Sequence, residues 1–405
     1  MLIKSAGVDP RTNPYTPNAG APPPALVGRD IELEGFEILL ERLRRGYAEQ
    51  SMLITGLRGV GKTVLLGAFE SRARASGWIT VTAEITKNED FGARMGGMVR
   101  RALFQVAPKT SWTDRLRRVA GALRSFSVTV ASDGSITAGL NVEPLEGIAD
   151  SGNLSDDLTD LLVVLGEAAQ ERETGIAFLV DEVQFLQGAE FEALIAGLHR
   201  TVQRQLPVTL VGAGLPQLPR LAGEAKSYAE RLFKFPRIGR LSASQAEAAL
   251  AEPAAELGVR YDPSAIDVIV DYTEGYPYFI QEYGKIVWDL APENEPIGKR
   301  VTDEAQRSVE AKLDESFFRV RAERTTELEL QYLRAMAELG RGEHTAGDVA
   351  AVMGRGSQQL GPTRARLIDK GLIYTTGHGR GDFTVPQFDR YLRRNHELAP
   401  TSTRS

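Results

Sequence analysis

One segment of the chain combines glycines, a lysine and a threonine at a spacing suited to phosphate binding. Residues 56–63 read GLRGVGKT, with glycines at the first, fourth and sixth positions. Glycines let the backbone wrap closely, so that successive N–H groups and the start of the following helix point at one phosphate. In such a loop the lysine pairs with the β- and γ-phosphates and the threonine ligates Mg²⁺. We therefore predict that ATP binds through Gly56, Leu57, Arg58, Gly59, Val60, Gly61, Lys62, Thr63 and Val64.

An acidic pair farther along the chain completes this chemistry. Residues 177–182 read AFLVDE, an apolar run that ends in two carboxylates. A carboxylate at the end of a buried strand is the usual partner of a phosphate loop, because it holds Mg²⁺ next to the phosphates. We predict that Asp181 holds Mg²⁺ together with Thr63. Glu182 is then the catalytic carboxylate that orients the attacking water, and Lys62 is the catalytic cation.

The elements that must position these residues follow from the alternation of short apolar runs with helical patterns. The runs at 51–55, 78–85, 177–181, 208–211 and 232–235 predict the strands of a parallel sheet with crossover helices. The fold class is therefore α/β. Between the second and third runs, Val128 and Val130 alternate in period two with residues beyond Asp133-Gly134, which predicts an inserted β-hairpin near 126–143.

Composition and pattern divide the chain further. Residues 1–25 are rich in Pro, Asn and Gly, and residues 399–405 form a short polar segment. We therefore expect both of these segments to be disordered. We expect the core at 26–240, a purely helical segment at 241–322, and three helices with a β-hairpin at 323–398. The last arrangement describes a winged helix.

Composition also excludes several classes of protein. The 405 residues contain no cysteine, so disulfides and thiolate zinc sites are excluded. No signal peptide or run of about 18 apolar residues is evident, and we expect a cytoplasmic protein without a membrane partner. The net charge of −6 argues against wholesale coating of nucleic acid but leaves a local basic face open.

Taken together, these motifs resemble the AAA+/STAND ATPases, and among them the prokaryotic relatives of the replication-origin-recognition ATPases. The resemblance rests on VGRD at 27–30, GLRGVGKT, LVDE at 179–182 and Gly275-Tyr276-Pro277. It implies an ASCE-type P-loop sheet, an all-α lid and a C-terminal winged helix. It further implies that Val27, Gly28 and Arg29 lie against adenine, that Pro277 closes over it, and that ATP and Mg²⁺ are the cofactors. Arg231 resembles the arginine finger supplied by a neighbouring subunit, with Arg237 and Arg240 as rivals, so self-association is expected.

The sequence also departs from this family pattern. Residues 208–215 read VTLVGAGL, which places no polar sensor after the fourth strand. The lid has Gly-Tyr-Pro where replication initiators carry an arginine that touches nucleotide. Without a finger in place we expect slow hydrolysis.

The winged helix is the candidate for contacting double-stranded DNA. The residues expected to face DNA are Arg355, Gln358, Gln359, Arg364 and Arg366, with His378 and Arg380 on the wing tip. Gly361-Pro362 is expected to interrupt the recognition helix. Two alternatives stay open, namely a STAND-like signalling ATPase whose winged helix binds protein, and a nucleotide-binding module with little hydrolysis.

Overall fold

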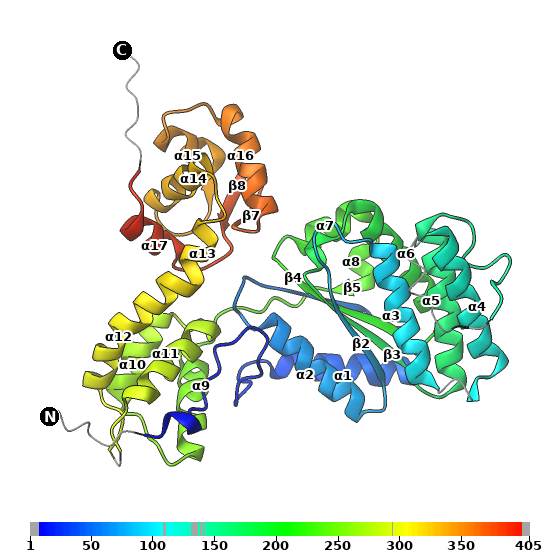
Figure 1. The fold of residues 1–405 in the computed structure, drawn as a ribbon, viewed down its shortest axis with the longest axis horizontal. Coiled ribbons are helices and arrows are strands. Elements are labelled where there is room, and N and C mark those ends of the chain that lie inside the picture. The colour runs from blue at the N-terminus through cyan, green and yellow to red at the C-terminus, as the bar shows by residue number, and fades with distance from the viewer. Residues whose placement is uncertain are drawn as a thin grey trace.

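A computed structural model of the protein describes residues 8–107, 111–130, 137, 140, 142–293 and 295–398. Figure 1 shows three parts, which are a sheet flanked by helices, a helical part, and a C-terminal part of small helices around short strands. From residue 30 onward the chain runs through them in this order, whereas the segment before it lies beside the helical part.

The sheet has five parallel strands in the order β2-β3-β4-β1-β5. The strands are β1 (Ser51–Thr55), β2 (Ile79–Glu84), β3 (Ile176–Asp181), β4 (Val208–Gly214) and β5 (Phe233–Lys234). Each predicted strand is present, and the α/β class is confirmed. Strands β1 and β4 are buried throughout, as apolar runs that are covered on both faces should be.

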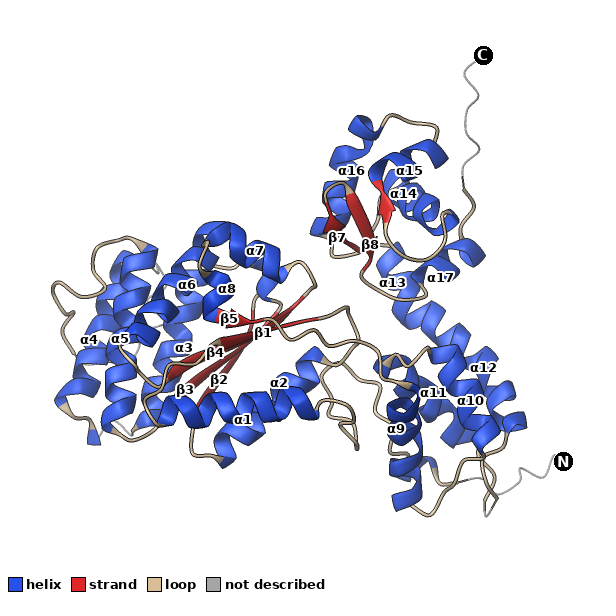
Figure 2. Cartoon of the chain, turned by 180° about the vertical axis from the view of Figure 1, so that it is seen from behind, coloured by secondary structure: helices blue, strands red, loops and turns tan. Residues whose placement is uncertain are grey.

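Alternate side chains of the strands belong to two separate apolar cores. Met52 and Ile54 pack with residues of α1 (Asp30–Arg44) and α2 (Lys62–Ala75), whose helices lie along one face of the sheet in Figure 2. Leu53 packs on the opposite face with a second group of helices. That group includes α3 (Phe91–Val106), α4 (Asp114–Thr129), α5 (Leu154–Glu171), α6 (Gly188–Gln203), α7 (Leu218–Ala225) and α8 (Ala229–Leu232).

The prediction that a β-hairpin begins near residue 126 is wrong. Residues 126–129 form the last turn of α4, and most of the rest of 126–143 lies outside the described residues. Leu116, Val119, Leu123 and Phe126 are all fully buried. Their spacing of three to four residues is a helical period, and it prevailed over the short period-two pattern that begins at Val128.

Four helices and an extension form the helical part. They are α9 (Ala243–Glu256), α10 (Pro263–Thr273), α11 (Pro277–Leu290) and α12 (Lys299–Leu313). Helix α12 continues through a π-helical turn, η5 (Asp314–Phe318), into α13 (Arg319–Ala322). This extension reaches the C-terminal part, as Figure 1 shows.

The prediction of a disordered segment over residues 1–25 is wrong for residues 8–25, while residues 1–7 lie outside the described part. Tyr15 is only 2% exposed, and its hydroxyl donates to the Leu250 carbonyl at 2.6 Å. Its ring packs edge-on against Trp288 and lies over Gly284, where a Cβ would clash. One aromatic side chain therefore anchors a segment whose overall composition indicates disorder. The predicted disordered tail at 399–405 lies outside the described residues.

The C-terminal part begins with α14 (Glu327–Glu338) and contains an antiparallel sheet in the order β6-β8-β7. Its other elements are β6 (His344–Thr345), α15 (Ala346–Val352), α16 (Ser357–Asp369), β7 (Ile373–Gly377), β8 (Arg380–Phe383) and α17 (Phe388–Asn395). The expected interruption of α16 is wrong, because the helix runs through Pro362 with Leu360, Thr363 and Leu367 buried along one face. No helix in the described ranges is both long and apolar enough to cross a bilayer.

Candidate functional site

The glycine-rich loop joins β1 to α2, and its glycines are required by its shape. Gly59 and Gly61 have φ of 81° and 93°, which side-chain-bearing residues rarely adopt. A Cβ on Gly56 would lie 2.6 Å from the Ile238 carbonyl oxygen. Helix α2 starts at Lys62 directly after Gly61, so its free N–H groups open into the loop.

Lys62 is held inside this loop. Its Nζ donates to the carbonyl oxygens of Gly56 at 2.9 Å and Leu57 at 2.8 Å. The side chain is buried, and burial lowers the pKa of Lys62 to about 8. The amine still carries its charge at neutral pH, and an anion in the loop would favour that charged form.

The two predicted Mg²⁺ ligands lie side by side. Thr63 Oγ1 donates to Asp181 Oδ2 at 2.6 Å, which joins the first turn of α2 to the end of β3. Burial raises the pKa of the Asp181 carboxyl. A hydroxyl and a carboxylate are hard oxygen ligands, and Mg²⁺ commonly uses one or two such protein ligands while its other positions hold water or phosphate. These residues therefore fit a Mg²⁺ ion.

Glu182 follows Asp181 in a left-handed conformation with φ of 56°, which turns its side chain away from the strand direction. One carboxylate oxygen lies 3.7 Å from Arg58 Nη1, and the other accepts a hydrogen bond from Gln184 Nε2. Gln184 Oε1 in turn accepts from the Leu215 backbone N–H at 3.1 Å. The predicted catalytic carboxylate is thus held between the phosphate loop and the end of β4.

Gln184 was not singled out from the sequence. A Cβ on Gly214, at the end of β4, would lie 2.3 Å from Gln184 Oε1. The amide of Gln184 therefore fills the place where the sequence showed no polar sensor. Its position two residues after Glu182 was the available signal, but only the fold shows that it reaches the neighbouring strand.

The glycine-rich loop and the acidic pair line a cavity of about 480 Å³ between the sheet and the helical part. Among the predicted binding residues, the cavity is lined by Val27, Arg29, Arg58, Gly59, Val60, Gly61, Lys62, Thr63, Val64 and Pro277, together with Asp181 and Glu182. Gly28, Gly56 and Leu57 do not line it. Gly28 packs against Gln245, and the other two hold Lys62 through their carbonyls. The Arg29 guanidinium donates to the carbonyls of Val60 and Gly239, each at 3.0 Å. It therefore joins the glycine-rich loop to the segment that follows β5.

The cavity also has lining residues that the sequence analysis missed. Residues of the 16–26 segment cover it, because Tyr15 anchors that segment beside the helical part. Tyr278 and Gln281 come from α11, and Ser316, Phe317 and Arg321 come from the extension of α12. Only tertiary structure brings these residues to the loop.

Arg231 lies outside the cavity of its own chain. It is exposed on α8, and its carbonyl accepts from Gln50 Nε2 at 3.0 Å. The rival Arg240 pairs with Glu274 at 2.7 Å. Neither side chain lines the cavity, nor does that of Arg237.

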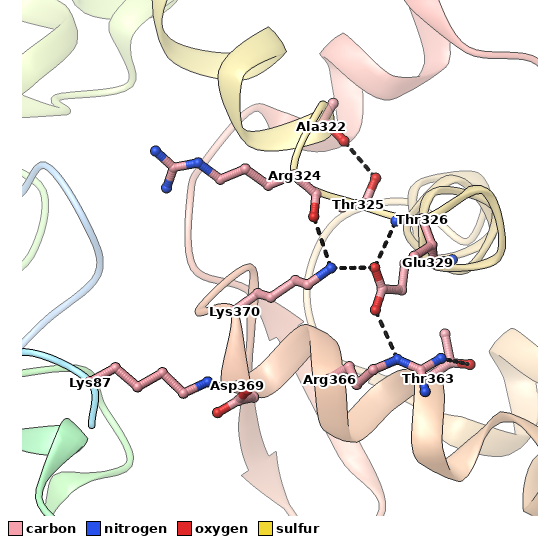
Figure 3. Close-up of polar contacts among 10 residues, drawn as sticks. All are labelled: Lys87, Ala322, Arg324, Thr325, Thr326, Glu329, Thr363, Arg366, Asp369 and Lys370. Atoms are coloured by element: carbon pink, nitrogen blue, oxygen red, sulfur yellow. Dashed lines mark hydrogen bonds and ion pairs between the residues drawn. The ribbon is translucent and has the colours of Figure 1, made fainter.

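Three of the basic residues expected to face DNA are held by the protein itself, namely Arg364, Arg366 and Arg380, of which Arg380 pairs with Glu343 at 2.7 Å. Glu329 has a fully buried side chain that accepts from Arg366 Nε at 3.0 Å and Lys370 Nζ at 2.6 Å, as Figure 3 shows. Arg364 donates to the Arg380 carbonyl at 2.7 Å. The exposed members of the expected set include Arg355, Gln358 and Gln359 on and before α16, and His378 in the turn after β7.

Comparison with known proteins assigns families to two segments. The AAA ATPase domain family matches residues 25–211, and a domain of unknown function (DUF8462) matches residues 315–392. No curated protein matches the chain.

Similar solved structures are distant in sequence. A Walker-type ATPase of Pyrococcus abyssi is 15% identical with a TM-score of 0.52, and the match covers 91% of this chain and 96% of that one. The Orc1 protein of Aeropyrum pernix in complex with DNA is 15% identical over 92% of this chain and 94% of its own, with a TM-score of 0.43. Cdc6p from Pyrobaculum aerophilum is 16% identical over 96% of this chain and 99% of its own, with a TM-score of 0.45.

The family match covers the segment that holds the glycine-rich loop and the acidic pair, and it agrees with the parallel sheet. The likeness to the Pyrococcus structure concerns the fold. Residues 25–211 therefore form an AAA ATPase domain.

Proposed function

We propose that the protein binds ATP with Mg²⁺ in the cavity between the sheet and the helical part, hydrolyses it slowly, and uses the nucleotide state as a switch. One observation carries this proposal. A single cavity is lined by the glycine-rich loop, by Asp181 and Glu182 from β3, and by Val27 and Pro277. These are the groups that a nucleotide needs at its phosphates and its base.

In this proposal the phosphates lie against the loop N–H groups and Lys62, and adenine lies by Val27 and Pro277. Thr63 and Asp181 hold Mg²⁺, which when bound neutralises charge on the phosphates. Thr63 would hold the ion with its hydroxyl, and Asp181 would hold it through water. Glu182 orients the attacking water and accepts its proton. Arg58 and Gln184 set the orientation of that carboxylate.

Slow hydrolysis follows from what the cavity holds. The Glu182 carboxylate is 3.7 Å from the Arg58 guanidinium, so it must leave or share that cation before it can accept a proton. An arginine finger is worth about 10³- to 10⁵-fold in rate. Arg231 is too far from its own cavity to line it, and we propose that it acts on the nucleotide of a second copy of the chain.

Phosphate release from Mg-ATP over a range of protein concentrations tests this proposal. The rate per subunit should rise with concentration, fall to background in EDTA, and lose its concentration dependence in Arg231→Ala. Arg220→Ala, which removes an exposed arginine of α7, is the matched control. Absence of phosphate release from the wild type at every concentration would remove the enzymatic function. A rate per subunit that does not change with concentration would remove the trans finger.

The nucleotide site is connected directly to the C-terminal part, which supports its use as a switch. The Arg58 backbone N–H donates to the Thr384 carbonyl at 3.1 Å, while the Arg58 carbonyl accepts from the Tyr276 hydroxyl. One residue of the phosphate loop is therefore held by the helical part on one side and by the C-terminal part on the other. A shift of the loop on nucleotide binding would change both contacts.

Glu274 forms a second connection, next to the Gly-Tyr-Pro segment. Its carboxylate pairs with Arg240 at 2.7 Å, Arg341 at 2.6 Å and Arg390 at 2.8 Å. Arg240 follows the last strand of the sheet, whereas the other two belong to the C-terminal part. One partly buried carboxylate thus joins all three parts at the hinge of the lid.

We further propose that residues 323–398 form a winged helix that acts on double-stranded DNA. The order α14, β6, α15, α16, β7, β8 and the sheet order β6-β8-β7 support this. Binding of protein is the second candidate, and it is favoured by Glu329, which neutralises Arg366 and Lys370 on the helix that would enter the groove.

Electrophoretic mobility of mixed duplex DNA at modest salt, with and without Mg-ATP, separates these two candidates. DNA binding predicts a retarded band that weakens in Arg355→Ala, because that exposed arginine would contact phosphate. Arg319→Ala removes an exposed arginine of α13 and should leave the band unchanged. No retardation with any duplex would leave the protein-binding role.

A further inference from the structure

An arginine reaches the cavity from an unexpected place. The sequence shows no lid arginine at the Gly-Tyr-Pro segment, but Arg321 lines the cavity together with Arg58, Lys62 and Thr63. It belongs to α13, the last turn of the extended helix that leads from the helical part into the C-terminal part.

The side chain of Arg321 is positioned without an acidic partner. Its guanidinium lies over the Phe317 ring, with Cζ 3.9 Å from the ring centroid, and Nη1 donates to the Phe317 carbonyl. Within the described residues, no carboxylate forms an ion pair with it. Burial and the neighbouring Arg58 lower the pKa of Arg321 to about 10, so the group stays charged at neutral pH. A partly buried cation with unused donors is poised for an anion.

The other charges that line the cavity also favour the binding of an anion. Four cations, Arg29, Arg58, Lys62 and Arg321, face two carboxylates, Asp181 and Glu182. Arg29 is satisfied by backbone carbonyls and Lys62 by the loop. Arg58 remains near Glu182, and Arg321 lies close enough to Arg58 for the two charges to repel each other.

The π-helical turn explains how α13 presents this residue. A π turn adds one residue to a turn of α-helix, so every side chain beyond it is rotated by about 100° around the helix axis. Residues Asp314–Phe318 form this turn, and Ser316 and Phe317 line the cavity with Arg321. The irregularity lies between the part that would bind nucleotide and the part that would respond to it.

We propose that Arg321 binds the terminal phosphate of ATP, distinguishes ATP from ADP, and relays that difference along α13 to the C-terminal part. This inference rests on the proposed function, because it assigns a residue to the same site. Arg321 is a specificity-determining residue here, since its guanidinium would touch a group that ADP lacks. Movement of Arg321 toward the phosphate would pull on a helix that only four residues separate from α14.

Calorimetric titration with ATPγS and with ADP, both in Mg²⁺, tests the inference. In Arg321→Ala the affinity for ATPγS should fall by about 10- to 100-fold, the value of a charge-assisted hydrogen bond that has been lost. The affinity for ADP should change by less than about 3-fold, which also shows that the variant is folded. Arg321→Lys should recover part of the loss, because it restores the charge without the planar fork. Arg319→Ala, on the same turn and exposed, is the matched control and should resemble the wild type.

Each outcome decides a different question. Equal losses for ATPγS and ADP in Arg321→Ala would assign the residue to packing and overturn the inference. An unchanged preference for ATPγS would overturn it as well. If the wild type binds neither nucleotide, the proposed function itself fails, whereas binding of both with an unaffected Arg321→Ala variant leaves that function standing.

Discussion

Glu182→Gln should lower the rate of ATP hydrolysis by about 10²- to 10⁴-fold, the contribution of a positioned general base, while ATP still binds. The amide keeps the size of the side chain and its contact with Gln184 but cannot accept a proton from water. The ion pair with Arg58 is lost at the same time, so nucleotide binding should be unchanged or slightly tighter. Single-turnover phosphate release with protein in excess over ATP measures the chemical step even when turnover is slow.

Glu230→Gln is the matched control, because Glu230 is an exposed carboxylate on α8 and does not line the cavity. It should hydrolyse ATP at the wild-type rate. A Glu182→Gln variant that is as fast as the wild type would show that another group activates the water.

Glu329→Ala should destabilise the C-terminal part by about 3 kcal/mol, near the lower end of the cost of breaking a buried ion pair. The Glu329 carboxylate is completely enclosed, and it accepts from Arg366, Lys370 and the Thr326 backbone N–H, as Figure 3 shows. The two cations are partly exposed, so water can solvate them after the change, and the cost stays at the lower end. Hydrogen–deuterium exchange should rise in α14 and α16 and not in the strands of the parallel sheet.

Glu327→Ala is the control, since Glu327 is an exposed carboxylate on the same helix and its removal should change stability by less than about 0.5 kcal/mol. Equal hydrogen–deuterium exchange in Glu329→Ala and Glu327→Ala would show that the buried Glu329 carboxylate does not stabilise the C-terminal part.

The same carboxylate gives a pH dependence with a definite sign. Burial alone would raise its pKa, but hydrogen bonds from Lys370, the Thr326 N–H and Arg366 lower the pKa of Glu329 to about 2, below the ordinary value of 4.5. A lowered pKa in the folded state contributes stability that is fully present above pH 4.5 and is lost as the pH falls from there toward 2. The difference in stability between wild type and Glu329→Ala should therefore shrink across this interval.

Much of the fold and the phosphate site could be predicted because both depend on local signals. The five strands follow short apolar runs, two of which are buried throughout, and each run was evident by itself. The loop at 56–63 and the pair Asp181-Glu182 have fixed spacing along the chain, so Thr63 and Asp181 could be expected to meet before any distance was known.

The parts that could not be predicted depend on single tertiary contacts. Tyr15 orders a segment with a disorder-prone composition, because one buried ring and its hydroxyl contact α9 and α11. Arg321 lies 263 residues after Arg58 and reaches the cavity through a π turn that no sequence pattern predicts. Gln184 and Glu329 likewise act through neighbours that are distant along the chain.

Calorimetric titration of the wild type and of Lys62→Ala with Mg-ATP tests the central claim, which is that the loop after β1 binds the triphosphate. The wild type should release heat and bind one ATP per chain. The variant should lose at least about 100-fold in affinity, because it lacks the buried cation that the loop carbonyls hold in place. No heat from the wild type, or equal binding by both proteins, would contradict the account.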